Sequence, residues 1–204
     1  MMAGYSILSL SDIIAEKGED FCREILSSFS CPLNRDVEQF LTKRSAIDFA
    51  KQGISQTFLV YASYRKENVI CGYFTIANKY IVVNKHSVSG TLGRRLRKFA
   101  MPSAAKNDLV IMAPLIAQLS KNYSSCYNEL ITGDELLKMA EEQIRLAQRI
   151  IGGKVVYLEC EDVERLKLFY GDNGYVEFGK RRLDKDERTE MCGTHLIQML
   201  KYLK

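Results

Sequence analysis

The sequence predicts a mixed α/β fold (mixed α+β) with a central mixed sheet. Three observations support this: two amphipathic helical stretches open the chain, short apolar strands joined by turns follow, and from residue 108 strands alternate with helices. Strands joined by short turns are antiparallel, whereas a crossover helix makes its two strands parallel. We expect residues 1–204 to form a single domain, since cores of about 100 to 200 residues are common.

The composition is that of an ordinary globular protein, with 47% apolar residues, 26% charged residues and a net charge of +4. It excludes the disordered and fibrous classes. The chain start lacks the basic region of a signal peptide and soon reaches Asp12 and Glu16. No run reaches the ~20 apolar residues that span a bilayer. We therefore expect a cytoplasmic protein without a membrane partner.

The cysteines predict buried, reduced thiols rather than a metal site. They are scattered at apolar positions without a CxxC pair, and they are Cys22, Cys31, Cys71, Cys126, Cys160 and Cys192. The two histidines, His86 and His195, share no spacing with them, and we expect both to be structural or solvated. Scattered thiols of this kind are typical of cytosolic proteins. Because the cysteines and histidines lack the spacing of metal ligands, no metal is expected.

The first half of the chain is predicted to hold two helices and then a meander of strands. Ser11 or Asp12 caps a helix that runs through Ser27. Asn34 caps the second helix, and Gly53 lies just beyond its end. The expected strands are 57–62, 69–76 and 80–83, with a polar turn at 65–68.

Residues 85–107, which we call the basic segment, interrupt the strand pattern as a loop or linker insertion. The segment has no acidic residue, and its basic residues are Lys85, Arg94, Arg95, Arg97, Lys98 and Lys106. Gly90, Gly93 and Pro102 break any long regular element. Two interpretations stay open: a solvated loop with a short helix, or an electrostatic guide for a polyanionic substrate.

From Asp108 the chain alternates strand and helix. Residues 109–119 form a long central strand, 121–129 an irregular polar stretch, and a helix follows from about Asp134 to Ile151. The predicted buried face of that helix is Leu136, Ala140, Ile144, Ala147 and Ile151. The remaining expected elements are a strand at 155–158, a helix at 163–170, a turn at 172–174, and strands at 175–178 and 195–203.

The start of the long helix is a candidate phosphate site. A helix N-terminus exposes backbone N–H groups at the positive end of the helix dipole, and these bind phosphate oxygens. Gly133 lets the backbone approach a ligand, and Lys121 adds a charge-assisted contact. The alternative is that Thr132-Gly133-Asp134-Glu135 is an ordinary helix cap that needs no ligand.

The second candidate element is the stretch from Leu168 to Gly179. Phe169 and Tyr175 are expected to fill core, whereas Tyr170 presents a hydroxyl at the end of an apolar ring. This stretch follows a βαβ unit and contains a Phe-Tyr pair, a short linker, Gly174 and a further aromatic residue. In these features it resembles the C-terminal half of GNAT acetyltransferases. Residues 34–60 resemble the first half of a bacterial and phage subgroup of that family, which includes acetyltransferase toxins.

The two matches cover most of the chain and leave residues 85–107 outside. The resemblance implies a GNAT-like sheet with N-terminal helices and a βαβ half that binds acetyl-CoA as co-substrate. The usual phosphate-loop pattern, Gln/Arg-x-x-Gly-x-Gly/Ala, is matched here only at Gly133. Val163 stands where the family often has Asn.

The resemblance also implies roles for single residues. Leu119 and Lys121 would pair with the pantetheine arm, and the backbone N–H groups of Thr132, Gly133, Asp134 and Glu135 would hold the pyrophosphate. Tyr170 would be the catalytic residue that serves the departing thiolate. A backbone N–H near Leu119 would polarise the thioester carbonyl.

The expected reaction is direct acetyl transfer to a primary amine of a small molecule, a protein or an aminoacyl-tRNA. The base stays open between Glu159 and Gln118 acting through water. A tRNA and a second copy in a homodimer are further partners that the sequence leaves open. The alternative from another class is a non-catalytic CoA-binding or regulatory module on a degenerate GNAT scaffold.

Overall fold

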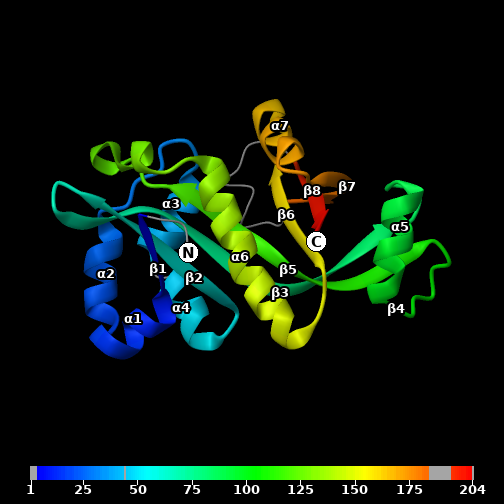
Figure 1. The fold of residues 1–204 in the computed structure, drawn as a ribbon, viewed down its shortest axis with the longest axis horizontal. Helices are drawn as coiled ribbons and strands as arrows, with labels where there is room; N and C mark the ends of the chain where they lie inside the picture. The colour runs from blue at the N-terminus through cyan, green and yellow to red at the C-terminus, as the bar shows by residue number, and fades with distance from the viewer. Residues whose placement is uncertain (1–3, 44, 184–193, 204) are drawn as a thin grey trace. The chain divides into compact units, whose positions relative to one another are not determined.

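The computed structural model describes residues 4–43, 45–183 and 194–203 (Figure 1). The chain divides into two compact units. Unit 1 comprises Met1–Ala77 and Ala117–Ala140, and unit 2 comprises Asn78–Ile116 and Glu141–Lys204. Two strands and one helix run through both units, and we describe each unit by itself. The expectation of a single domain stays a prediction.

The strands form a mixed sheet in the order β1-β2-β3-β5-β6-β8-β7, with β4 pairing on β5. Only the pairing of β5 with β6 is parallel among the described registers, as expected for strands joined by a crossover helix. This confirms the mixed α/β prediction. The strands are β1 Tyr5–Ser9, β2 Ser55–Tyr64, β3 Glu67–Asn84, β4 Ala100–Met101, β5 Asp108–Lys121, β6 Val155–Glu161, β7 Val176–Arg182 and β8 His195–Tyr202.

The two predicted N-terminal helices are each split in two. Gly18, at φ 84°, ends the first helix, and extended Lys43 ends the third. The predicted cap of the second stretch is confirmed, because Asn34 Oδ1 accepts from Val37 N at 3.1 Å. The helices are α1 Leu10–Lys17, α2 Glu19–Ser27, α3 Arg35–Thr42, α4 Ser45–Gln52, α5 Gly90–Leu96, α6 Gly133–Ile151 and α7 Glu164–Asp172, with 3-10 turns η1 Arg97–Phe99 and η2 Ser124–Leu130.

In unit 1, the helices α1 to α4 pack against the sheet formed by β1, β2 and the first part of β3 (Figure 1). Their apolar stripes supply a buried cluster that includes Leu10, Leu26, Leu41 and Ile47. Tyr73 of β3 is fully buried in this cluster and donates its hydroxyl to Val37 O at 2.6 Å. The N-terminal helices therefore cover one face of the sheet.

One strand was missed by the sequence analysis, and one strand prediction was wrong. β1 was not predicted, and β3 is one long strand where two were expected. The exposed polar residues Asn78 and Lys79 resemble a turn in sequence, yet their backbone stays extended. Extended backbone tolerates polar side chains wherever they face solvent, so polarity alone did not identify a turn. The turn at Arg65 and Lys66 is confirmed by positive φ at both residues.

The buried face of α6 also differs from the prediction towards its end. Leu136, Ala140 and Ile144 are buried as expected, whereas Ala147 is exposed and Ile151 is 72% exposed. The buried position in that last turn is Gln148, whose Nε2 donates to Val155 O at 2.9 Å. A polar side chain takes the inward position because a strand carbonyl needs a donor there.

In unit 2, residues 90–101 of the basic segment form α5, η1 and β4, and the residues on either side of them are turns and loops. Leu96 of α5 is fully buried against Ile81, Val83 and Ile111, and Phe99 packs on the same cluster. The predicted short helix is therefore present and anchored. No helix among the residues that the structure describes is long and apolar enough to cross a membrane.

Candidate functional site

The N-terminus of α6 in unit 1 is closed by a reciprocal capping box. Thr132 Oγ1 accepts from Glu135 N at 3.2 Å, while Glu135 Oε2 accepts from Thr132 N at 2.9 Å and from Thr132 Oγ1 at 2.8 Å. These hydrogen bonds lower the pKa of the Glu135 carboxyl. Thr132 and Glu135 thus satisfy each other's N–H groups, as the cap interpretation expects.

Tyr5 of β1 stabilises the start of α6, although it is more than 120 residues away in sequence. Its hydroxyl donates to Leu130 O at 2.8 Å and to Glu135 Oε2 at 3.4 Å. Burial, followed by the neighbouring Glu135 carboxylate, raises the pKa of Tyr5. Gly133 lies between the two capping residues, and none of the described groups accepts from its N–H. Gly133 therefore keeps an N–H that a ligand can use.

The end of β5 offers a backbone edge in unit 1. The parallel ladder with β6 covers Leu115↔Tyr157 and Ile116↔Leu158 in unit 2, while β5 runs on to Lys121. In unit 1 the stretch after Ile116 has β3 on one side and no second strand among the described residues. Leu119 and Lys121 are half-buried there. An unpaired strand edge binds an extended, amide-containing chain such as pantetheine.

Asn122 anchors the loop that follows this strand, and sequence reasoning missed it because its only signal is a polar residue after an apolar run. It is 2% exposed, and its Nδ2 donates to Ile70 O at 2.8 Å. Its Oδ1 accepts from Ser30 N at 3.1 Å and from Ser124 N at 3.0 Å. Both polar atoms of its side chain are hydrogen-bonded, so Asn122 fixes the path between β5 and η2.

Tyr170 lies in unit 2, in the last turn of α7. Its half-buried ring meets Phe169 and Tyr175 edge-on, with centroid distances of 4.9 Å and 5.9 Å. Its hydroxyl makes no hydrogen bond to any residue of the described chain. Burial, followed by the nearby Cys160, raises the pKa of Tyr170, so its hydroxyl keeps its proton at neutral pH. A protonated, unpartnered hydroxyl is suited to donate to an external acceptor.

Two buried and two half-buried side chains border Tyr170 through Tyr175, and we call them the Glu141 cluster: Glu141 and Tyr175, with Arg145 and Lys201. Glu141 is 4% exposed and its Oε1 accepts from Lys201 Nζ at 2.6 Å. Its Oε2 lies 3.5 Å from Arg145 Nη2. Lys201 Nζ is 5.4 Å from the ring centroid of Tyr175. The cluster fixes the packing behind the Tyr170 ring.

The two candidate bases are held by other side chains. Glu159 Oε2 accepts from Arg181 Nε at 2.8 Å, and its Oε1 accepts from Gln198 Nε2 at 2.8 Å. A carboxylate with both oxygens occupied is poorly placed to take a proton from a substrate. In unit 1, Gln118 Nε2 donates to Asp36 Oδ2 at 3.2 Å. These contacts favour structural roles for both.

The predicted buried, reduced thiols are found at four of the cysteines. Cys22, Cys31, Cys71 and Cys160 are buried free thiols, and Cys126 is exposed; Cys192 lies outside the described residues. Burial raises the pKa of Cys71 and of Cys160 to about 11, so both stay protonated. Within the described ranges, no group of three or more His, Cys, Asp or Glu could hold a metal ion.

The structure thus gathers the predicted cofactor residues of unit 1 in two places. Thr132, Gly133, Asp134 and Glu135 lie at the start of α6, while Leu119 and Lys121 end β5. Tyr170 belongs to unit 2. The roles of these residues stay predictions. The contact that Tyr5 makes with the capping box depends on a strand that the sequence did not reveal.

Several solved structures similar to this chain are of bacterial toxins. AtaT complexed with acetyl-methionyl-tRNAfMet has a TM-score of 0.61 at 15% identity, covering 95% of this chain and 93% of that chain. A KacT mutant in which a tyrosine is replaced by phenylalanine has a TM-score of 0.61 at 14% identity, covering 96% and 94%. AtaTR bound with AcCoA has 0.56 at 16%, covering 96% and 93%.

No protein-family model matches the chain, and no curated protein is similar to it in sequence. The similarity to AtaT and KacT therefore establishes the fold. It extends over nearly the whole of both chains.

Proposed function

We propose that this chain is an N-acetyltransferase that moves the acetyl group of acetyl-CoA to a primary amine, and that this amine belongs to an aminoacyl-tRNA. The observation that carries the proposal is Tyr170, whose hydroxyl is protonated and has no partner in the described chain. The fold supports it, since AtaT was solved with an acetylated methionyl-tRNA and AtaTR with acetyl-CoA.

The reaction needs one nucleophilic attack and three proton transfers. The amine nitrogen attacks the thioester carbonyl carbon, the C–N bond forms, the C–S bond breaks, and CoA leaves as a thiolate. Tyr170 donates a hydrogen bond to the sulfur as its charge develops and then passes its proton to it. The acetylated nitrogen loses its extra proton to solvent, and solvent returns a proton to the Tyr170 oxygen. Atoms and charge balance without a metal or redox step.

The residues that would hold acetyl-CoA fit an extended, phosphorylated ligand. The unpaired edge of β5 at Leu119 suits the amides of pantetheine, and a backbone N–H there polarises the thioester carbonyl. Lys121 and the N–H of Gly133 suit phosphate oxygens. Asp134 contributes through its backbone only, because its carboxylate repels phosphate.

Thr132 and Glu135 have a second role that competes with phosphate binding. Their N–H groups already donate within the capping box, so a phosphate would have to displace these hydrogen bonds. The enzyme would also lower the barrier by holding acetyl-CoA and the amine side by side. Such proximity contributes up to ~7–11 kcal/mol in favourable cases. We place the reaction in the cytoplasm, where acetyl-CoA and charged tRNA are both present.

A second candidate function follows from the closed capping box. If Thr132 and Glu135 never release their hydrogen bonds, the chain would be a non-catalytic module on the same fold. One similar structure is AtaT bound to the C-terminus of its antitoxin with acetyl-CoA, so a protein partner on this fold has precedent. Binding of acetyl-CoA without acetyl transfer to any acceptor would favour this second function.

The test is acetyl transfer from radiolabelled acetyl-CoA to Met-tRNA, to a peptide N-terminus and to a small amine. We expect transfer to the charged tRNA, with kcat lowered by about 10²–10⁴ in Tyr170→Phe, since positioned proton donors contribute factors of that size. The unfolding midpoint of this variant should match that of the wild type. Tyr80→Phe, at a side chain 62% exposed, is the matched control and should transfer normally.

Three outcomes separate the alternatives. Transfer to peptide or small amine but not to tRNA would keep the enzyme and replace the acceptor. Wild-type turnover in Tyr170→Phe would remove Tyr170 as the proton donor. Bound acetyl-CoA seen by mass spectrometry, with no transfer to any acceptor, would replace the enzyme by the binding module.

A further inference from the structure

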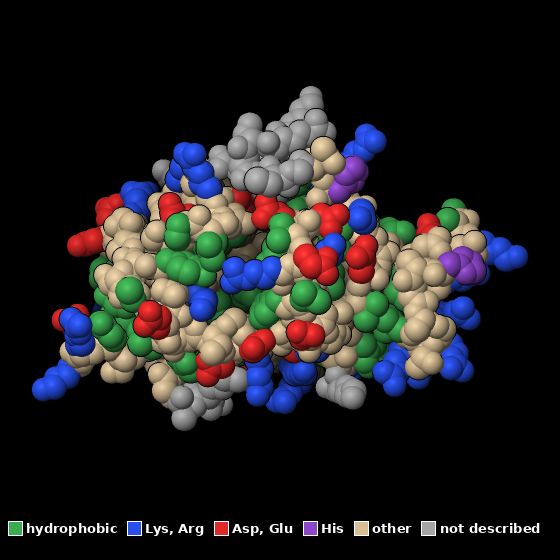
Figure 2. Space-filling view, turned by 90° about the horizontal axis from the view of Figure 1, so that it is seen from above, with side chains coloured by type: hydrophobic (Ala, Val, Ile, Leu, Met, Phe, Trp, Pro, Cys, Tyr) green, Lys and Arg blue, Asp and Glu red, His purple; other side chains and the backbone are tan. Residues whose placement is uncertain are grey.

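The basic segment concentrates positive charge to a degree that the rest of the chain does not share. It holds six of the 29 Lys and Arg and none of the 25 Asp and Glu, so the rest of the chain has a small net negative charge. Figure 2 shows Lys and Arg side chains gathered at the end of the view where α5 and β4 lie. The net positive charge of the protein is therefore local.

These basic side chains have no acidic partners in the part of the chain that the structure describes. None of the six forms an ion pair with any of the described residues, whereas Lys167, Lys180 and Arg181 elsewhere in unit 2 all do. Five of the six are exposed, and Lys85 is half-buried. Arg95 is engaged in part, since its guanidinium carbon lies 5.5 Å from the ring centroid of Tyr202.

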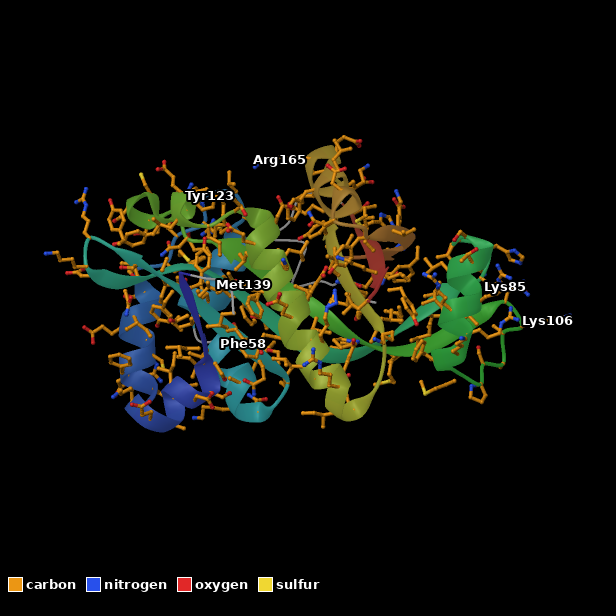
Figure 3. The ribbon with its side chains drawn as sticks, in the orientation of Figure 1. Phe58, Lys85, Lys106, Tyr123, Met139 and Arg165 are labelled. Carbon is orange, nitrogen blue, oxygen red and sulfur yellow. The ribbon has the colours of Figure 1, made fainter. Side chains whose placement is uncertain are left out.

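The backbone that carries the charges is fixed. Leu92, Leu96 and Phe99 pack into the buried cluster of unit 2. The two ends of the segment are tied together, because Lys85 N donates to Asn107 O at 2.8 Å. Figure 3 shows Lys85 and Lys106 close to one another beside α5. These contacts anchor the backbone of α5 and η1, which carries Arg94, Arg95, Arg97 and Lys98.

The spacing of the charges suits a row of phosphates. Arg94, Arg97 and Lys98 are related by three and four positions along α5 and η1, so they share one face of a continuous helical stretch. They extend over ~6 Å along the helix axis at 1.5 Å per residue. Guanidinium groups bind phosphate oxygens in a bidentate manner.

A membrane surface fits less well. Peripheral helices insert a free apolar face into the bilayer. The apolar side chains of α5 are instead used inside the protein, and Leu96 is fully buried. The exposed positions of α5 are Gly90, Thr91, Arg94 and Arg95, so no large apolar side chain is free to insert. The positive charge that remains there suits a phosphate backbone.

We propose that the basic segment is an RNA-docking surface that binds the phosphate backbone of a tRNA through Arg94, Arg97, Lys98 and Lys106. The identification of the RNA as a tRNA depends on the proposed function. The identification of a phosphate-binding surface depends on the exposed charges and on the packing of α5 and η1. The segment adds affinity and orientation without sequence readout, since backbone contacts carry no base information. It takes no part in the acetyl transfer step.

The experiment compares two variants with the same reduction of positive charge. In the docking variant, Arg94, Arg97, Lys98 and Lys106 are each changed to Gln, which spares Arg95 and its contact with Tyr202. In the matched control, Lys17, Arg23, Lys43 and Lys51 are changed to Gln; each of these side chains contacts an acid or an amide of unit 1. Binding of deacylated tRNA is measured by fluorescence anisotropy between 50 and 300 mM KCl.

The docking variant should bind tRNA at least about tenfold more weakly at 100 mM salt. Its plot of log K against log salt should flatten by up to about 3.6, since each of four phosphates that are no longer neutralised accounts for about 0.9 of the slope. The control variant should change less than about twofold. Equal weakening in both variants would overturn the proposal in favour of a net-charge effect, and unchanged binding in both would remove the surface. Tighter binding of duplex DNA or of polyglutamate by the wild type would also overturn the assignment to RNA.

Acetyl transfer to a small amine or a peptide separates this proposal from the proposed function. The docking variant should retain any such transfer, because none of its changes touches Tyr170 or the α6 start. Tyr170→Phe should bind tRNA as tightly as the wild type. Weak tRNA binding in the docking variant, without acetyl transfer by any form, would leave the surface standing and the acetyltransferase proposal refuted.

Discussion

In the Glu141 cluster the buried carboxylate has two basic partners within the chain, whereas no basic side chain of the basic segment forms an ion pair with a described residue. Both regions belong to unit 2 and both carry several charges. Glu141 is 4% exposed, while Arg94, Arg97 and Lys98 lie in solvent. The two regions thus show two uses of charge in one compact unit.

The difference has a simple physical origin. A buried charge loses its hydration and destabilises the fold unless it is paired and hydrogen-bonded. An exposed charge keeps its water and needs no partner, so it is available to an external ligand. Tyr170 follows the second pattern, since its polar atom has no partner among the described residues. Polar groups without internal partners are therefore the better guide to function in this chain.

The largest change in stability is expected at Glu141. Glu141→Gln leaves Lys201 beside an uncharged amide, which should lower the free energy of unfolding by about 3 kcal/mol, at the low end for a broken buried pair because Lys201 is 23% exposed. Urea unfolding measures this. Glu16→Gln, which breaks an exposed pair with Lys17, should leave the midpoint unchanged. Equal shifts in both variants would contradict the comparison.

A smaller loss of stability is expected at Glu159, the carboxylate considered as a base. Glu159→Gln weakens its hydrogen bonds from Arg181 and Gln198 and should cost about 2 kcal/mol, the usual value for charge-assisted bonds. Acetyl transfer should stay within about threefold of wild type, because this carboxylate is used inside the protein. A fall of a hundredfold or more in kcat would instead make Glu159 the base.

The capping box should contribute about 1 kcal/mol, the usual size for a helix cap. Thr132→Ala removes the hydroxyl that accepts from Glu135 N. Thr132→Ser keeps the oxygen and should unfold like the wild type. If Thr132 only caps the helix, the KM for acetyl-CoA should change less than threefold in both variants; a tenfold rise in Thr132→Ala alone would show a phosphate contact.

The capping box also predicts that the stability of the fold depends on pH. Hydrogen bonds from Thr132 hold the pKa of Glu135 below its ordinary value of about 4.3. The stability they contribute is complete above that pH and is lost as the pH falls through the lowered pKa. Glu135→Gln should therefore be less stable than the wild type at neutral pH, and the difference should shrink as the pH falls through the lowered pKa of Glu135. A constant difference across that range would exclude the carboxylate as its source.

The smallest change in stability is expected in the basic segment. The docking variant lacks four charges that have no ion-pair partners among the described residues, so its unfolding midpoint should match that of the wild type. Added salt should raise the midpoint of the wild type slightly more than that of the variant, because salt screens repulsion among the basic side chains. A clear destabilisation would mean that these side chains support the fold.

Elements with a strong local pattern could be predicted from the sequence. β5, α6 and β6 were expected within a few residues of their bounds, because a long apolar run and a 3.6-residue period do not depend on partners. Asn34 begins a helix and Gly53 follows one, as predicted, since caps act locally. β1 was missed because five residues before a helix are too few to show a period, and its strand state depends on pairing with β2.

In the candidate site, too, local features could be read from the sequence and distant contacts could not. The motifs pointed to Tyr170 and Gly133, whose roles stay predictions, and the missing acids pointed to the basic segment. The sequence alone specifies which chemical groups this protein has and which local elements carry them, because propensity and periodicity act over a few residues. The folded arrangement alone shows which groups are already satisfied: Glu135 by Thr132 and Tyr5, Glu159 by Arg181, Glu141 by Lys201. Most of those partners are distant in sequence and are brought together by packing, which no short stretch of sequence encodes.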